Sequence, residues 1–139
     1  MKRINTLLAV TTLVVVLAVG SFNSTFAAGK GQQKKARQVN TLIQGIQSEN
    51  EGLRRSSIYL AGRYAIAEAV PALVEELKQE DEASNKILIS LALYYIGDEA
   101  GLEKVKELVH KDTDERVRRM AYAIYDTFTK NFSSDLSVR

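Results

Sequence analysis

The chain of 139 residues has no cysteine, no tryptophan, one proline and one histidine. Without cysteine it can form no disulfide framework, no thiol nucleophile and no lipid anchor on a cysteine after an N-terminal segment. His110 is the only histidine and precedes "KDTD", at the predicted end of a helix. A histidine in that place usually interacts with the helix dipole or caps the helix C-terminus. A metal pair such as H-E-x-x-H and a glycine-rich phosphate loop are also missing. The sequence therefore predicts no enzyme activity, no metal and no cofactor.

The N-terminus has the three parts of a signal peptide. Lys2 and Arg3 provide the positive start, and Leu7–Val19 is an apolar run. Small residues follow, so we expect cleavage after Ala27 and a secreted or periplasmic protein. The alternative is a retained membrane anchor, but a spanning helix needs about 20 apolar residues.

The net charge of the chain comes from this segment. The full chain has 19 Lys and Arg against 17 Asp and Glu. The first 27 residues contain Lys2 and Arg3 and no acid, so the remainder has 17 charges of each sign. A neutral chain has no global attraction to nucleic acid or to anionic lipid. We therefore expect no nucleic-acid partner, and no membrane contact after cleavage.

Three segments recur at intervals of 32 residues: "LRRSSIYLAGRY" from Leu53, "NKILISLALYYI" from Asn85 and "VRRMAYAIYDTF" from Val117. Their apolar residues are spaced as on one face of an α-helix. The predicted core positions on these helices are Leu60, Ala92 and Ile124, followed by Tyr64, Ile96 and Phe128.

A second set of segments lies between them. "EAVPALVEEL" (Glu68–Leu77) and "AGLEKVKELV" (Ala100–Val109) align at 32 residues, and "RQVNTLIQGI" (Arg37–Ile46) aligns at 31. Pro71 falls in the first turn of its helix, where its missing N–H has no intrahelical partner to lose.

The pattern predicts an all-α solenoid of three helical hairpins, with six helices in all. The predicted helices are 34–47 with 51–64, 68–79 with 82–96, and 99–110 with 114–128. The domain covers 34–130, in units of about 34–65, 66–97 and 98–130. We expect a flexible leader at 28–33 and a flexible tail at 131–139.

Two long stretches, "LRRSSIYLAGRYAIAEAVPALVEEL" and "IGDEAGLEKVKELVHKDTDERVRRMA", resemble HEAT-repeat proteins of the short, phycobilisome-lyase-like type. The resemblance covers the chain from about Lys35 to Phe128. It implies an ARM-like α-solenoid whose second helices line a concave face, and a family that mostly binds other proteins. Some relatives attach bilins or bind nucleic acid, but no residue of this chain inherits such a role.

The resemblance also implies a polar ladder, in which an acid in each intra-hairpin turn pairs with a basic residue just inside the second helix. Asp112 with Arg118 fits this pattern, and Glu80 with Lys86 has the same separation of six. The first repeat departs, because Ser48 stands opposite Arg54 there. We expect this ladder to be structural.

All six tyrosines lie on the predicted second helices. Tyr64 and Tyr125 fall on the predicted core face, and the others fall on or beside the opposite face. Tyrosine and arginine around an aliphatic centre are typical of protein-binding hot spots. The alternative is packing, since the middle helix is apolar nearly all round. The candidate partner-binding face comprises Arg55, Tyr59, Arg63, Ile87, Leu91, Tyr94, Tyr95, Arg119 and Tyr122.

The sequence leaves three functions open. The first is an exported, non-catalytic interaction module that binds a protein partner on the concave face. The second is a self-associating assembly protein of the cell envelope, with a terminal stripe of Met120, Ile124, Phe128 and Phe132 as its contact. The third is a lyase-like protein that handles a small ligand or chromophore, which requires a pocket lined by Tyr94 and Tyr95.

Overall fold

The computed structural model describes residues 30–137, which contain helices and no strand. Residues from Val39 onward belong to one compact unit, and residues 30–38 belong to another. The predicted signal peptide and its cleavage site lie outside the described residues. None of the helices in the described part is long and apolar enough to cross a membrane.

Six α-helices and one short 3₁₀ helix follow one another in the described range. After a first helical segment at residues 30–46 come α2 (Glu51–Arg63), η1 (Ala67–Ala69), α3 (Val70–Gln79), α4 (Ala83–Ile96), α5 (Glu99–Lys111) and α6 (Glu115–Ser137). The predicted all-α fold is confirmed. Two ends differ from the prediction, because residues 30–33 and 131–137 are helical where a leader and a tail were expected.

Local chemistry explains where the helices begin and end. Asn50 caps α2 and Asp98 caps α5, each accepting a hydrogen bond from the backbone N–H three residues later, at 3.0 and 2.7 Å. Pro71 is the second residue of α3, in the first turn as predicted. Gly97 ends α4 with φ of 75°, a left-handed conformation that glycine adopts without a steric cost.

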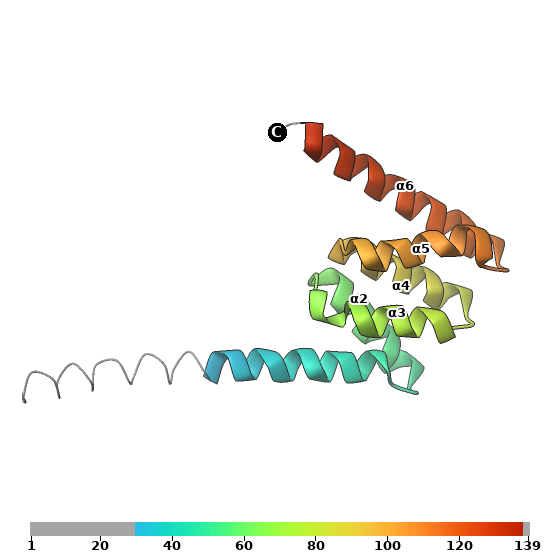
Figure 1. Cartoon of the computed structure of the whole chain (residues 1–139). Coiled ribbons are helices and arrows are strands. Elements are labelled where there is room, and N and C mark those ends of the chain that lie inside the picture. Colours follow the sequence, from blue (N-terminus) through green and yellow to red (C-terminus); the bar gives the residue numbers. More distant parts are fainter. Residues whose placement is uncertain (1–29, 138–139) are drawn as a thin grey trace, which may run out of the picture. The chain divides into compact units, whose positions relative to one another are not determined.

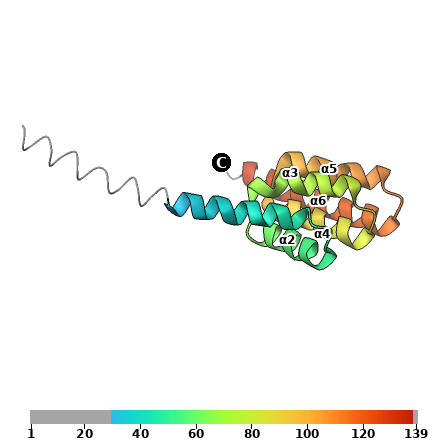
Figure 2. The same cartoon turned by 90° about the horizontal axis from the view of Figure 1, so that it is seen from below.

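The helices from Val39 onward form two layers. α2, α4 and α6 lie side by side in one layer, and α3 and α5 lie in the other (Figures 1 and 2). Fully buried side chains such as Ile58, Leu73, Leu93 and Val105 fill the space between the layers. Each hairpin thus places its second helix in the same layer, so residues 32 apart occupy equivalent sites.

The core positions of α4 and α6 agree with the prediction, because Ala92 and Ile124 are buried. The prediction for α2 was wrong, since Leu60 is 39% exposed and Tyr64 is 65% exposed. The physical reason is the close contact of α2 with α4, which turns Ile58 and its neighbours inward instead.

Tyr125, also predicted on the core face, is only half-buried. Its hydroxyl donates a hydrogen bond of 2.9 Å to Glu103 on α5. Ile96 and Phe128, predicted in the core, are partly buried and pack against it.

Candidate functional site

One edge of the second-helix layer is polar. Ser48, Glu80 and Asp112 hold equivalent places, 32 residues apart, in the turns before α2, α4 and α6. A side-chain oxygen of each accepts a hydrogen bond from the backbone N–H two residues later, at 3.2, 2.9 and 2.8 Å respectively. All three therefore order the turn that starts their own second helix.

The basic residues of this edge join neighbouring repeats. Lys86 Nζ lies 2.7 Å from Asp112 Oδ2 of the next repeat, with both side chains largely buried. Arg54 Nε lies 3.1 Å from Glu76 and 3.9 Å from Glu80, again in the next repeat. The expected pairing of Glu80 with Lys86 inside one hairpin was wrong. Glu80 is engaged by its own turn and by Arg54, and Lys86 reaches forward instead.

The two arginines of the ladder also contact their own turns. Arg54 donates to the Ser48 carbonyl at 2.9 Å, and Arg118 donates to the carbonyls of Asp112 and Thr113 at 2.9 Å. Asp112 with Arg118 thus does meet, but through a backbone oxygen. The ladder binds turn to helix and repeat to repeat, which is a structural role.

The opposite end of the same helices carries an apolar groove. A hollow of about 510 Å³ lies between α2 and α4. Small residues form its floor and aromatic residues form its rims, with Tyr59 50% exposed and Tyr95 65% exposed. The lining residues are Tyr59, Gly62, Arg63, Leu88, Leu91, Ala92 and Tyr95.

The groove exists because two small residues meet at its floor. A Cβ atom added at Gly62 would lie only 2.7 Å from Ala92 Cα and 3.0 Å from Ala92 Cβ. The helices therefore touch almost backbone to backbone at this crossing. The longer side chains on either side rise around a depression.

The rim of the groove carries a positive charge. Arg63 donates a hydrogen bond of 2.8 Å to the hydroxyl of Tyr59, and its guanidinium lies 5.9 Å from the centre of that ring. The hydrogen bond with Tyr59 raises the pKa of Arg63 above its ordinary value. The contact also orients the phenol ring by hydrogen bond and cation–π attraction together. A partner would meet an arginine and a tyrosine already held in place.

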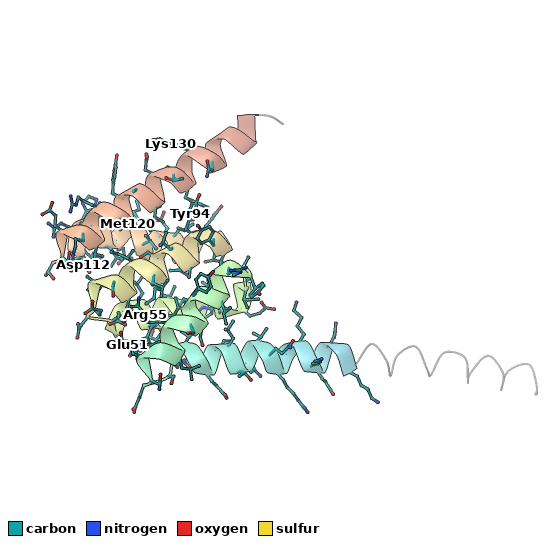
Figure 3. All side chains as sticks on the ribbon, turned by 180° about the vertical axis from the view of Figure 1, so that it is seen from behind. Glu51, Arg55, Tyr94, Asp112, Met120 and Lys130 are labelled. Carbon is teal, nitrogen blue, oxygen red and sulfur yellow. The ribbon has the colours of Figure 1, made fainter. Side chains whose placement is uncertain are left out.

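Four of the nine predicted residues line this groove: Tyr59, Arg63, Leu91 and Tyr95. Arg55 does not, because it is used inside the fold. It donates to Ser84 at 3.2 Å and to the buried side chain of Asn85, and so ties α2 to α4. Figure 3 shows Arg55 on the side of α2 that faces α4.

The other four predicted residues lie outside the groove. Tyr94 turns toward α6, where its hydroxyl accepts a hydrogen bond of 3.3 Å from Asn131, and its ring meets the ring of Tyr95 edge-on at 5.5 Å (Figure 3). Ile87 is half-buried, and Arg119 pairs with Glu115 of its own helix at 3.6 Å. Tyr122 is 61% exposed.

Sequence reasoning missed Gly62, Leu88 and Ala92 as groove residues. Ala92 was assigned to the core alone, and it does have both roles because it is buried beneath the groove. The available signal was a glycine inside a predicted helix, which often marks a close approach of two backbones.

A family model described as HEAT repeats matches residues 35–124. The chain belongs to the HEAT-repeat family. No curated protein matches its sequence. HEAT repeats generally mediate protein–protein interaction, so the exposed groove of this HEAT domain is the natural candidate for a binding surface.

Proposed function

We propose that this HEAT domain is an exported, non-catalytic interaction module that binds a protein partner in the groove between α2 and α4. The observation that carries the proposal is the pair of exposed tyrosines, Tyr59 and Tyr95, beside a close helix crossing at the small residues Gly62 and Ala92. Exposed aromatic rims around a preformed apolar hollow are typical of binding hot spots. Arg63 adds a hydrogen-bonding charge that fixes the register of the partner.

Export is supported by the sequence of the first 27 residues. The positive start, the short apolar run and the small residues before Ala28 form a signal-peptide pattern. The neutral charge of the remaining chain favours a partner recognised by shape rather than by strong charge.

The two alternative functions have less support. The terminal stripe proposed for self-association is interrupted, because Ile124 is only 5% exposed. A ligand-handling protein of that kind requires Tyr94 and Tyr95 in one pocket, whereas Tyr95 lines the groove and Tyr94 does not.

Photo-crosslinking tests the groove directly. A benzoyl-phenylalanine at position 95 replaces an exposed tyrosine by a similar aromatic side chain, and it should capture a protein from the envelope of the producing cell. The matched control places the same group at Lys78, an exposed residue of α3 in the other layer. We expect capture from position 95, loss of that capture with Tyr59→Ala, and no equivalent product from position 78.

The opposite result is equally clear. Equal products from both positions, or capture unaffected by Tyr59→Ala, would exclude the groove as the binding surface. A cross-link between two copies of the chain, together with a mass that rises with concentration, would favour self-association instead.

A further inference from the structure

The third repeat, the last one within residues 30–137, carries a second hollow, separate from the groove of the proposed function. It measures about 540 Å³ and lies between α5 and α6. Its lining residues are Glu99, Ala100, Leu102, Glu103, Tyr125, Phe128 and Thr129. The repeat itself indicates what kind of element this surface receives.

In the second repeat, the equivalent surface is covered by α5. This helix packs on α3 and α4 together. Its residue Gly101 lies against Leu93, because a Cβ atom added there would come within 2.8 Å of Leu93 Cδ2. Leu93 is fully buried as a result, whereas Tyr125, its equivalent 32 residues later, is only half-buried. The hollow is thus the place that the first helix of a further repeat would take.

The polar edge shows the same incomplete site. Arg54 and Lys86 each reach a carboxylate of the following repeat. Arg54 pairs with Glu76 and Glu80, and Lys86 pairs with Asp112. Arg118 is their equivalent, and it pairs with no carboxylate among the described residues. Its guanidinium donates to carbonyl oxygens of its own turn. A helix lying on this end would bring a carboxylate to it.

The spacing of the missing contacts can be read from the repeats that are present. The small residue and the ladder acid are eleven positions apart in both, Ala69 with Glu80 and Gly101 with Asp112. Both small residues are buried, and Gly101 lies against Leu93 of the preceding repeat. A spacing of seven also occurs, because Glu76 lies seven positions after Ala69 and is the nearer partner of Arg54. One helix can therefore satisfy the hollow and Arg118 together when its carboxylate stands seven or eleven positions after its small residue.

We propose that the C-terminal end of the stack is a docking site for an amphipathic helix of a partner protein, bound in the place of a fourth repeat's first helix. That helix carries a small residue over Tyr125 and a carboxylate seven or eleven positions later against Arg118, with apolar residues between them. A second copy of this chain does not fit. Its own first helix has Gln38 and Ser48 at the aligned positions, so it lacks both features.

The probe is a peptide of residues 98–114, because α5 makes this contact on the preceding repeat. It carries a hydrocarbon bridge between positions 106 and 110, both exposed on α5, since a free helix of this length is only marginally stable. Binding to the full chain is followed by fluorescence anisotropy, after circular dichroism has established that the peptide is helical. We expect saturable binding, weakened about tenfold by Asp112→Asn in the peptide, which removes one charge-assisted contact, and abolished by Gly101→Leu.

Variants of the protein locate the site. Ala100→Arg fills the hollow from an exposed position and should weaken binding at least tenfold, whereas Ala123→Arg, at an exposed alanine of α6 outside the hollow, should not. With Arg118→Gln in the protein, the parent peptide and its Asp112→Asn form should bind with equal affinity. This comparison is valid even if the Arg118→Gln protein is less stable, because both peptides meet the same protein. Tyr95→Ala should leave the peptide affinity unchanged, and so separates this site from the groove.

Absence of binding by the helical peptide overturns the proposal. Binding that is indifferent to Gly101→Leu and Ala100→Arg also overturns it, because it would show a contact elsewhere. If the full chain binds a second copy of itself at this end, with the same sensitivity to Ala100→Arg, the occupant is a copy and the partner helix is excluded.

Discussion

The two ends of the second-helix layer are built on the same helices and have opposite character. At the end where α2, α4 and α6 begin, charged side chains are drawn inward, and Asp112 keeps only 3% of its side chain exposed. At the end where α2 and α4 finish, tyrosines stand outward around Gly62 and Ala92. Polarity alone therefore does not decide which residues this fold buries.

The difference arises from what each end must satisfy. The charged edge contains the turns of the hairpins, whose backbone N–H groups need hydrogen-bond acceptors. The carboxylates of Glu80 and Asp112 accept hydrogen bonds from these N–H groups and also pair with a basic side chain, so their burial is tolerated. The groove contains a helix crossing whose closeness is set by small residues, so the large side chains have no space below them. Substitutions at each end test this explanation.

Gly62→Leu should have the largest effect, because it breaks the crossing beneath the groove. A side chain at this position collides with the backbone of Ala92, so the helices must separate. We expect a loss of about 3 kcal/mol in the free energy of unfolding, as for severe overpacking of a core, measured by chemical denaturation. The control is Gly31→Leu in the first helical segment, where no atom lies within 4 Å of the added Cβ. A stable Gly62→Leu protein would contradict the tight crossing.

Lys86→Met should have the next largest effect and acts on the charged edge. The substitution leaves the nearly buried carboxylate of Asp112 without its cation, at a cost of about 2 kcal/mol in the free energy of unfolding. Lys111→Met is the matched control, since Lys111 and its partner Glu107 are exposed and should contribute little. Equal losses of stability from the two substitutions would show that the Lys86–Asp112 pair contributes no more than an exposed surface ion pair.

The sequence was sufficient for the repeat, because period and hydrophobic spacing are local properties. It predicted all three hairpins, the place of Pro71 and most helix limits within a few residues. It misplaced the buried face of α2, because Leu60 and Tyr64 are large and apolar whereas the residues that actually pack, such as Gly62, give no hydrophobic signal. Exposure of Leu60 follows from the crossing, which depends on residues 30 positions away.

The candidate site was predicted in part for the same reason. Tyr59 and Tyr95 could be assigned to one face from helical spacing, but nothing local shows that Tyr94 turns toward α6. Arg55 was missed as a structural residue, because its partner Asn85 is 30 residues away. Contacts between repeats are set by the stacking of hairpins, and the sequence pattern shows only that they stack.

Asn50→Ala should have a smaller effect on the charged edge. Asn50 caps α2 through its hydrogen bond to the N–H of Leu53, and its loss should cost about 1 kcal/mol in the free energy of unfolding. Asn50→Asp keeps an acceptor at the same position and should retain the stability of the parent chain. A loss of similar size in both variants would show that the cap is not the source of the effect.

The smallest expected effect concerns the pH dependence of the charged edge. Hydrogen bonds from the side chain and then the backbone of Arg116 lower the pKa of Asp114 to about 2, below its usual value. A lowered pKa in the folded state means that the ionised carboxylate favours folding. Its contribution is therefore complete above about pH 4 and is lost as the pH falls toward 2.

Asp114→Asn isolates this contribution, because asparagine can still accept the hydrogen bond from the N–H of Arg116 that starts α6. The thermal midpoint of the parent chain should exceed that of the variant slightly at pH 6, and the difference should shrink between pH 4 and pH 2.5. The difference stays small because the pair is exposed and water screens it. If the difference in thermal midpoint instead grows as the pH falls, the Asp114 carboxylate opposes folding. The electrostatic stability of this edge would then come from the buried pair of Lys86 and Asp112.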